Sequence, residues 1–112
     1  MAENAPDLHM QALEAAAFRR LTQHLQQRQD ATNIDLMALA GFCRNCLSEW
    51  LEDASIEAGT PLLRDDARSH VYGEPYAAYK ARQPDATPDQ IARMNASLLE
   101  NARVRALATK GS

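Results

Sequence analysis

The amino-acid sequence predicts an all-α fold, a compact bundle of four or five helices around a central apolar helix at about residues 34–58. Three observations predict it: apolar residues recur at helical spacing, helix-capping sequences precede them, and no segment alternates apolar and polar residues as a half-buried strand does. The 112 residues, 46% of them hydrophobic, suit a single domain spanning residues 1–112. We expect frayed ends at about residues 1–6 and 109–112.

The first predicted helix begins after Asp7 and runs to about Arg28. Phe18, Leu21 and Leu25 lie at helical spacing within it, and charged or amide side chains fill most of the other positions. This pattern is typical of an amphipathic helix with one face on the core. Residues 29–32 then interrupt it.

The central helix is predicted to begin after Asn33, a suitable capping residue, and to end at Gly59. Its first part, residues 34–42, is apolar on almost every side, and such a helix must be covered all round. A small monomer covers one helix fully only with difficulty, so we expect a homodimer that buries part of it. Gly41 is a weak helix residue, and a break there would make Cys43 the start of a new segment.

Three further helices follow in the chain. Thr60-Pro61 predicts a helix with proline at its first position, and Gly73 ends it. A short helical segment carrying the next tyrosines ends before Pro84. Residues 87–90, Thr-Pro-Asp-Gln, form a capping box that opens a final helix reaching about Ala108.

The overall charge and the cysteine content limit the class of protein. A net charge of −3 and the lack of a basic cluster interleaved with aromatics argue against nucleic-acid binding. No segment is apolar for long enough to span a membrane, and the start of the sequence lacks the pattern of a signal peptide. Two cysteines cannot form a disulfide framework for a chain of this length, so we expect a cytoplasmic protein.

The cysteine pair Cys43 and Cys46 allows three interpretations. Both side chains continue an apolar helix face, so simple burial is the first. The second is a zinc or iron site, for which a histidine or a second copy of the chain must supply the missing ligands. The third is thiol chemistry, which requires that a break at Gly41 place Cys43 at a helix start, where backbone N–H groups stabilise a thiolate.

Other side chains suggest a catalytic alternative. Asp66 and His70 are four residues apart on a predicted helix, so the carboxylate could orient the imidazole. Together with Cys43 as nucleophile they would form a thiol-dependent enzyme, redox or nucleophilic. The same spacing is common on solvated helix faces.

Two surfaces could bind partners. Glu49, Asp53 and Glu57 form a row of like charges that a basic protein partner, or the chain's own arginines, could neutralise. The tyrosines could line a pocket or pack the short helix on the core. The arginines considered are Arg44, Arg64 and Arg68, and the tyrosines are Tyr72, Tyr76 and Tyr79.

Three segments carry a resemblance to a known family: Gly41 to Leu47 (G-F-C-R-N-C-L), Asp65 to Arg68, and Tyr72 to Tyr76. There, and over about residues 13–99, the chain resembles a family of short bacterial proteins catalogued as a domain of unknown function. The resemblance implies a compact helical fold and supplies no activity, cofactor or catalytic residue. The leading expectation is therefore a non-enzymatic structural or interaction module.

Overall fold

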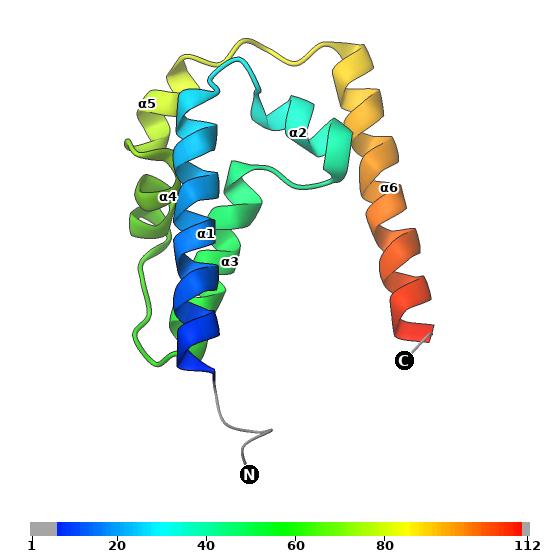
Figure 1. The fold of residues 1–112 in the computed structure, drawn as a ribbon. Helices are drawn as coiled ribbons and strands as arrows, with labels where there is room; N and C mark the ends of the chain where they lie inside the picture. The colour runs from blue at the N-terminus through cyan, green and yellow to red at the C-terminus, as the bar shows by residue number, and fades with distance from the viewer. Residues whose placement is uncertain (1–6, 111–112) are drawn as a thin grey trace.

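The computed structural model of the chain describes residues 7–110 and confirms the all-α class. The ends at 1–6 and 111–112, where fraying was expected, lie outside the described residues. Within them the elements form an arch, in which α2 joins one limb made of α1, α3, α4 and α5 to a second limb made of α6 (Figure 1). The helices are α1 Leu8–Gln27, α2 Asn33–Ala40, α3 Arg44–Glu57, α4 Arg64–Tyr72, α5 Tyr76–Ala81 and α6 Pro88–Lys110.

The starts of α1 and α2 are capped by side chains. Asp7 Oδ1 accepts a hydrogen bond from the Met10 N–H at 2.9 Å. Asn33 was the predicted cap of the second helix, but Thr32 takes that position in a capping box with Asp35. The side chain of Asn33, now the first residue of α2, is thereby free for longer-range hydrogen bonds.

The continuous helix predicted at about residues 34–58 is wrong: two helices, α2 and α3, occupy this segment. Gly41 ends α2 in the left-handed conformation at φ 73°, and Cys43 is extended before α3 begins. The Asn101 amide of α6 donates to the Gly41 carbonyl oxygen at 2.8 Å, so α6 packs directly on this turn. Because only glycine adopts this conformation without strain, the break occurs at Gly41.

The loop before α4 also differs from the prediction. Helix α4 begins at Arg64 and not at Pro61. The Leu62 N–H donates to Ser55 Oγ at 2.9 Å, and Leu63 remains extended as the N-cap. This hydrogen bond ties the loop to α3 in place of a first helical turn. Gly73 ends α4 as predicted.

The hydrophobic core lies entirely in the first limb. Its fully buried members come from α1, α3, α4 and α5, and α6 contributes none. The radius of gyration is 16.4 Å, whereas a compact domain of this length would have about 13 Å. The molecule is therefore more extended than the compact bundle expected. None of the described helices has the length and apolar character needed to cross a membrane. The buried core residues are Leu25, Leu47, Val71, Tyr72 and Tyr79.

Candidate functional site

A buried arginine lies at the centre of the first limb. Arg44, the first residue of α3, is 1% exposed. Its Nη2 donates to the carbonyl oxygens of Leu25 at 2.8 Å and Arg28 at 2.9 Å, and its Nη1 donates to that of Ala31 at 2.8 Å. The last carbonyls of a helix lack intrahelical partners, so this guanidinium completes the end of α1 and the turn that follows.

The remaining partners of Arg44 are also neutral. Nη1 is 3.2 Å from Asn33 Oδ1 and 3.3 Å from the Tyr79 hydroxyl, and the guanidinium lies 5.5 Å from the centre of the Tyr79 ring. Within residues 7–110 its Nε has no hydrogen-bond partner. Among the described residues no carboxylate pairs with Arg44. A full positive charge is thus held in the core by neutral acceptors alone.

A second set of hydrogen bonds joins α2, α3 and α4. Asn33 Nδ2 donates to the Tyr72 hydroxyl at 2.9 Å, and that hydroxyl donates to Asn45 Oδ1 at 2.6 Å. Burial raises the pKa of Tyr72, which keeps the hydroxyl protonated and able to donate. Asn33 belongs to both sets, since its Oδ1 accepts from Arg44 while its Nδ2 donates to Tyr72.

The cysteine pair lies next to this cluster. Cys43 is the N-cap residue of α3 and is 7% exposed, and Cys46 is half-buried; both are free thiols. Burial raises the pKa of the Cys43 thiol, although the backbone N–H groups of Cys46 and Asn45 act in the opposite direction. The break at Gly41 therefore places Cys43 at a helix start, but desolvation opposes thiolate formation there.

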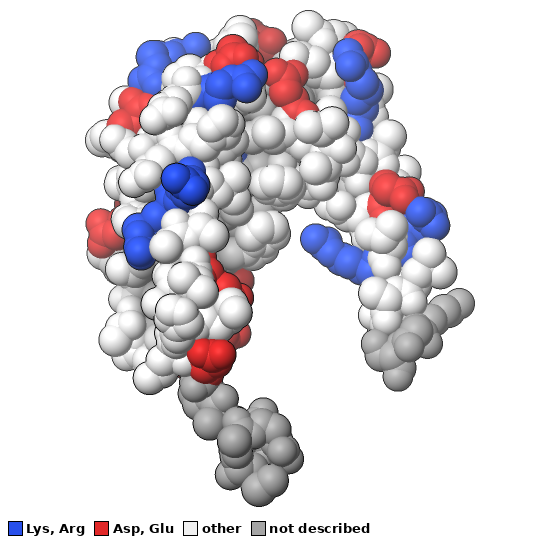
Figure 2. All heavy atoms as spheres, in the orientation of Figure 1, with Lys and Arg blue, Asp and Glu red and all other residues white. Residues whose placement is uncertain are grey.

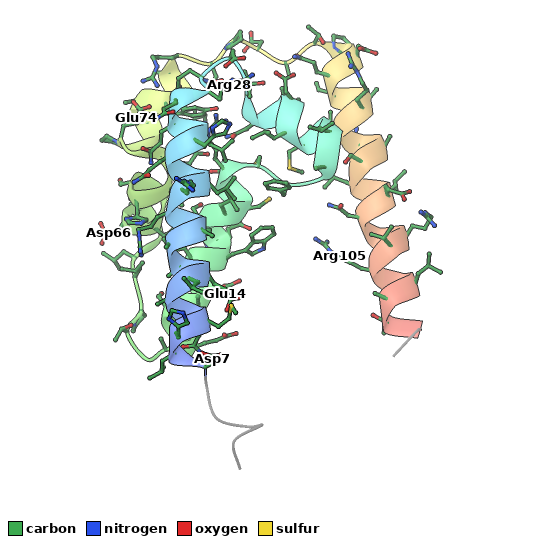
Figure 3. All side chains as sticks on the ribbon, in the orientation of Figure 1. Asp7, Glu14, Arg28, Asp66, Glu74 and Arg105 are labelled. Atoms are coloured by element: carbon green, nitrogen blue, oxygen red, sulfur yellow. The ribbon has the colours of Figure 1, made fainter. Side chains whose placement is uncertain are left out.

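Asp66 and His70, proposed to support the thiol, lie on the exposed surface of α4. Figure 3 shows Asp66 pointing away from the other helices. Within the described part of the chain, no hydrogen bond or ion pair joins Cys43 to either residue. The three residues therefore lie in different surroundings: Cys43 is buried, whereas Asp66 and His70 are exposed to solvent.

A metal site at the cysteine pair has two ligands in one chain. Residues 7–110 contain no group of three or more histidine, cysteine, aspartate or glutamate side chains that could hold a metal ion. Cys43 and Cys46 would therefore have to share a metal with ligands from another molecule.

The acidic row on α3 is exposed along its length. Glu49, Asp53 and Glu57 have no ion-pair partner among the described residues. The three arginines considered for this role have other contacts: Arg44 is buried, Arg64 lies 3.5 Å from Glu52, and Arg68 lies 4.6 Å from the centre of the Tyr76 ring.

Sequence reasoning missed the roles of Arg44, Asn33 and Asn45. From the sequence, a single arginine between two cysteines is interpreted as a surface residue, since arginine is rarely buried without a carboxylate partner. The signal in the sequence was its position: Arg44 lies three residues after Gly41, between two cysteines of an apolar stripe.

These features define a class: a small all-α protein whose middle segment is organised by a buried arginine, two asparagines and two tyrosines. Residues 31–96 match the family described as Protein of unknown function (DUF1244), and the chain belongs to this family. The match is shorter than the 13–99 expected and leaves out α1 and the distal half of α6. It includes Arg44 and all the asparagines and tyrosines of the cluster. No curated protein matches the chain.

Proposed function

We propose that this chain is a non-enzymatic interaction module that works as a homodimer, with the α6 arm of each copy filling the hollow of the other. One observation supports the proposal: the hollow of the arch is lined by apolar side chains that the other described residues, 7–110, leave exposed. Figure 2 shows this hollow bordered mainly by surface that is neither acidic nor basic.

The α3 side of the hollow is strongly apolar. Phe18, Trp50, Leu51 and Ala54 line a pocket of about 280 Å³ there. Trp50 is 49% exposed, and its ring stacks on Phe42 with the ring centres 6.1 Å apart. Exposed apolar patches of this kind mark interaction sites in small proteins.

The α6 side offers a matching surface. Arg105 points into the hollow (Figure 3), and Leu98 lies seven residues earlier, two turns away on the same face of the helix. Leu98 therefore faces the hollow too, and its side chain is 42% exposed there. Beyond Asn101, which contacts Gly41, the helix continues away from α2 (Figure 1). The distal part of α6 is thus an arm whose inner face lacks a cover.

The exposed area supports a second copy as the occupant. The accessible surface is 8172 Å², compared with about 6,100 Å² expected for a folded monomer of 12.4 kDa. The excess is larger than the ~800 Å² that each partner buries in a standard interface. Reciprocal insertion of two arms covers both apolar surfaces with one symmetric contact.

Charge complementarity favours the same occupant. Asp53 follows Trp50 by three residues, so the acidic row borders the apolar surface of α3. The Arg105 side chain has no ion-pair partner among residues 7–110. In a symmetric dimer, an inserted α6 brings Arg105 next to the acidic row of the other copy, twice per dimer.

Light scattering on the full chain tests the dimer. We expect a mass of about 25 kDa at micromolar concentration, twice the 12.4 kDa of one chain. Leu98→Glu should give monomers, because it buries a carboxylate in the apolar contact. Leu99→Glu is the matched control, because Leu99 occupies the adjacent position, faces away from the hollow and is 73% exposed. This variant should remain dimeric. A wild-type mass of 12.4 kDa, or equal effects of the two variants, would refute the proposal.

In this proposal Cys43 is a core residue, and the cytoplasm, where thiols stay reduced, is the proposed compartment. The two free thiols support this, and burial of Cys43 weighs against the alternative of a thiol-dependent enzyme with Asp66 and His70. Alkylation of a Cys46→Ser variant by iodoacetamide separates the two. A core thiol reacts appreciably only in denaturant, whereas a catalytic thiol reacts rapidly in the native protein.

The remaining alternative is a zinc or iron ion held by Cys43 and Cys46. Because one chain offers two thiolates, two copies would have to share one ion. Elemental analysis of protein purified without an affinity tag tests this. One zinc or iron per two chains, lost in Cys43→Ser, would support the metal, and metal-free folded protein would exclude it.

A further inference from the structure

A pocket of about 250 Å³ lies beside the buried arginine, with Asn33 and Tyr79, two of the partners of Arg44, in its wall. It lies where the first turns of α2, α3 and α6 meet α5, and it is separate from the hollow of the arch. The residues that line it include three with side-chain amides, a lysine and two tyrosines: Asn33, Asn45, Gln90, Lys80, Tyr76 and Tyr79. We propose that this pocket binds a small organic anion through its carboxylate or phosphate group.

The charges around the pocket favour an anion. Among the described residues, no aspartate or glutamate lines the pocket and Lys80 has no ion-pair partner. The Arg44 guanidinium lies directly behind the wall, because Nη1 donates to Asn33 Oδ1 and to the Tyr79 hydroxyl. Since Arg44 is 1% exposed and has only neutral partners, its charge is poorly screened by solvent.

Helix dipoles act in the same direction. Asn33 is the first residue of α2, Asn45 is the second of α3 and Gln90 is the third of α6. The N-terminal end of a helix carries a partial positive charge, so three such ends converge on one pocket. Three carboxylates are next to lining residues in the sequence: Asp35 accepts from the Thr32 N–H, Asp89 pairs with Arg93, and Asp85 is not among the residues that line the pocket.

The remainder of the wall indicates the rest of the ligand. Ile34, Tyr76 and Pro84 offer apolar surface beside the polar groups. This combination of apolar wall and a few convergent polar groups is typical of small-molecule sites, and the volume suits a molecule smaller than a drug. A compact apolar body with one anionic group fits both features. The pocket also lies wholly within the segment that matches the family, residues 31–96.

Titration followed by nitrogen–proton correlation NMR on the full chain tests the proposal. The probes are benzoate, phenyl phosphate, inorganic phosphate and neutral benzamide. We expect saturable shifts at Asn33, Asn45 and Gln90 with an anionic probe and none with benzamide. Benzoate and phenyl phosphate distinguish a carboxylate from a phosphate ligand, and inorganic phosphate alone shows whether the apolar body is required.

Lys80→Gln supplies the mutational test. It should weaken binding of the anionic probe at least about fivefold, the scale of one charge-assisted hydrogen bond. Arg82→Gln is the control, because Arg82 pairs with Glu74 and does not line the pocket. Three results would each overturn the proposal. They are equal binding of benzamide, unchanged affinity in Lys80→Gln, and no saturable shift with any anion up to a concentration of about 10 mM.

Discussion

Arg44 shows how one side chain can organise several segments. Its donors reach the end of α1, the turn after it, the first residue of α2, and α5. A buried guanidinium loses its hydration, so its stability in the core depends on these five acceptors. Removing or rearranging the donors would leave several buried carbonyl groups unpaired at once.

Replacing Arg44 by lysine should therefore be costly even though the charge is kept. A single ammonium cannot reproduce the planar fork that serves acceptors on both Nη atoms. We expect Arg44→Lys to lower the free energy of unfolding by about 3 kcal/mol or more. Urea unfolding at one fixed protein concentration measures it. Arg64→Lys is the exposed control, for which we expect a change within ~0.5 kcal/mol; similar effects of both substitutions would contradict this role.

Three buried groups, one thiol and two tyrosine hydroxyls, should make the free energy of unfolding depend on pH in the alkaline range. Burial raises the pKa of Cys43 above its ordinary 9.0, and of Tyr72 and Tyr79 above their ordinary 10.0. As pH rises, the unfolded chain loses these protons first, so the folded chain then holds more protons and becomes less stable. We expect the free energy of unfolding to fall from about pH 9 upward.

Urea unfolding between pH 7 and 11 measures this fall. In Cys43→Ala the decline should begin about one pH unit later, because the tyrosines with ordinary pKa of 10.0 then dominate. Stability that is constant or rises over this range would show that these groups are not buried in their neutral forms.

At the scale of the helices, local signals predicted several boundaries well. The cap at Asp7, the end of α4 at Gly73 and the capping box at Thr87 all appear in the structure. Each depends on residues within four positions of one another, so the sequence contains the whole interaction. The start of α4 was missed because Ser55, seven residues away, accepts the Leu62 N–H.

The split between α2 and α3 required longer-range information. The apolar run over residues 34–42 continues smoothly into α3, and helix propensity alone penalises Gly41 by only about 1 kcal/mol. The glycine turn at the break is contacted by Asn101, 60 residues later in the sequence, and we expect this contact to stabilise the break. The same holds for the site, where Asn33 meets Tyr72 at a separation of 39 residues.

Gly41 and Gly59 form a matched pair for testing that contact. Both have positive φ, 73° and 78°, so alanine at either position carries a backbone cost of about 1 kcal/mol. A Cβ at Gly41 would overlap the Asn101 amide, whereas a Cβ at Gly59 would meet nothing within 4 Å. We expect Gly41→Ala to cost about 1–3 kcal/mol more than Gly59→Ala in urea unfolding.

A second substitution identifies the cause. Asn101→Ala removes the overlapping amide, so Gly41→Ala should cost less in that background than in the wild type. If the cost of Gly41→Ala were the same in both backgrounds, or equal to that of Gly59→Ala, the contact between α6 and the turn would not control the break.

For the whole molecule, the two proposed binding surfaces lie on different parts of the arch. The segment within residues 31–96 holds the buried arginine cluster and the proposed anion pocket, whereas the outer half of α6 stands apart from the other helices (Figure 1). The homodimer predicted from the apolar residues 34–42 is thus proposed on other surfaces, since α6 already covers part of α2. The packing of α6 on α2 could not be predicted from the sequence. The apolar face of α6 shows that it packs on something, but not on which helix.

The charges that border the hollow test which molecule fills it. In the proposed dimer Arg105 lies near the acidic row that includes Asp53, so Arg105→Glu should weaken the dimer, and added salt should weaken the wild-type dimer. Mixing Arg105→Glu chains with Asp53→Lys chains should restore association, because both contacts of a mixed dimer then join opposite charges, one pair reversed and one native. Sedimentation velocity of each variant and of the mixture measures this.

If a different, basic protein filled the hollow, the mixture would associate no better than either variant alone. If apolar contact alone held the dimer, Arg105→Glu and Asp53→Lys would each leave the mass unchanged. Recovery in the mixture alone therefore requires that the acidic row of one copy and the arm of another lie side by side. That outcome would also explain why the row Glu49, Asp53 and Glu57 lacks an ion pair within residues 7–110 of its own chain.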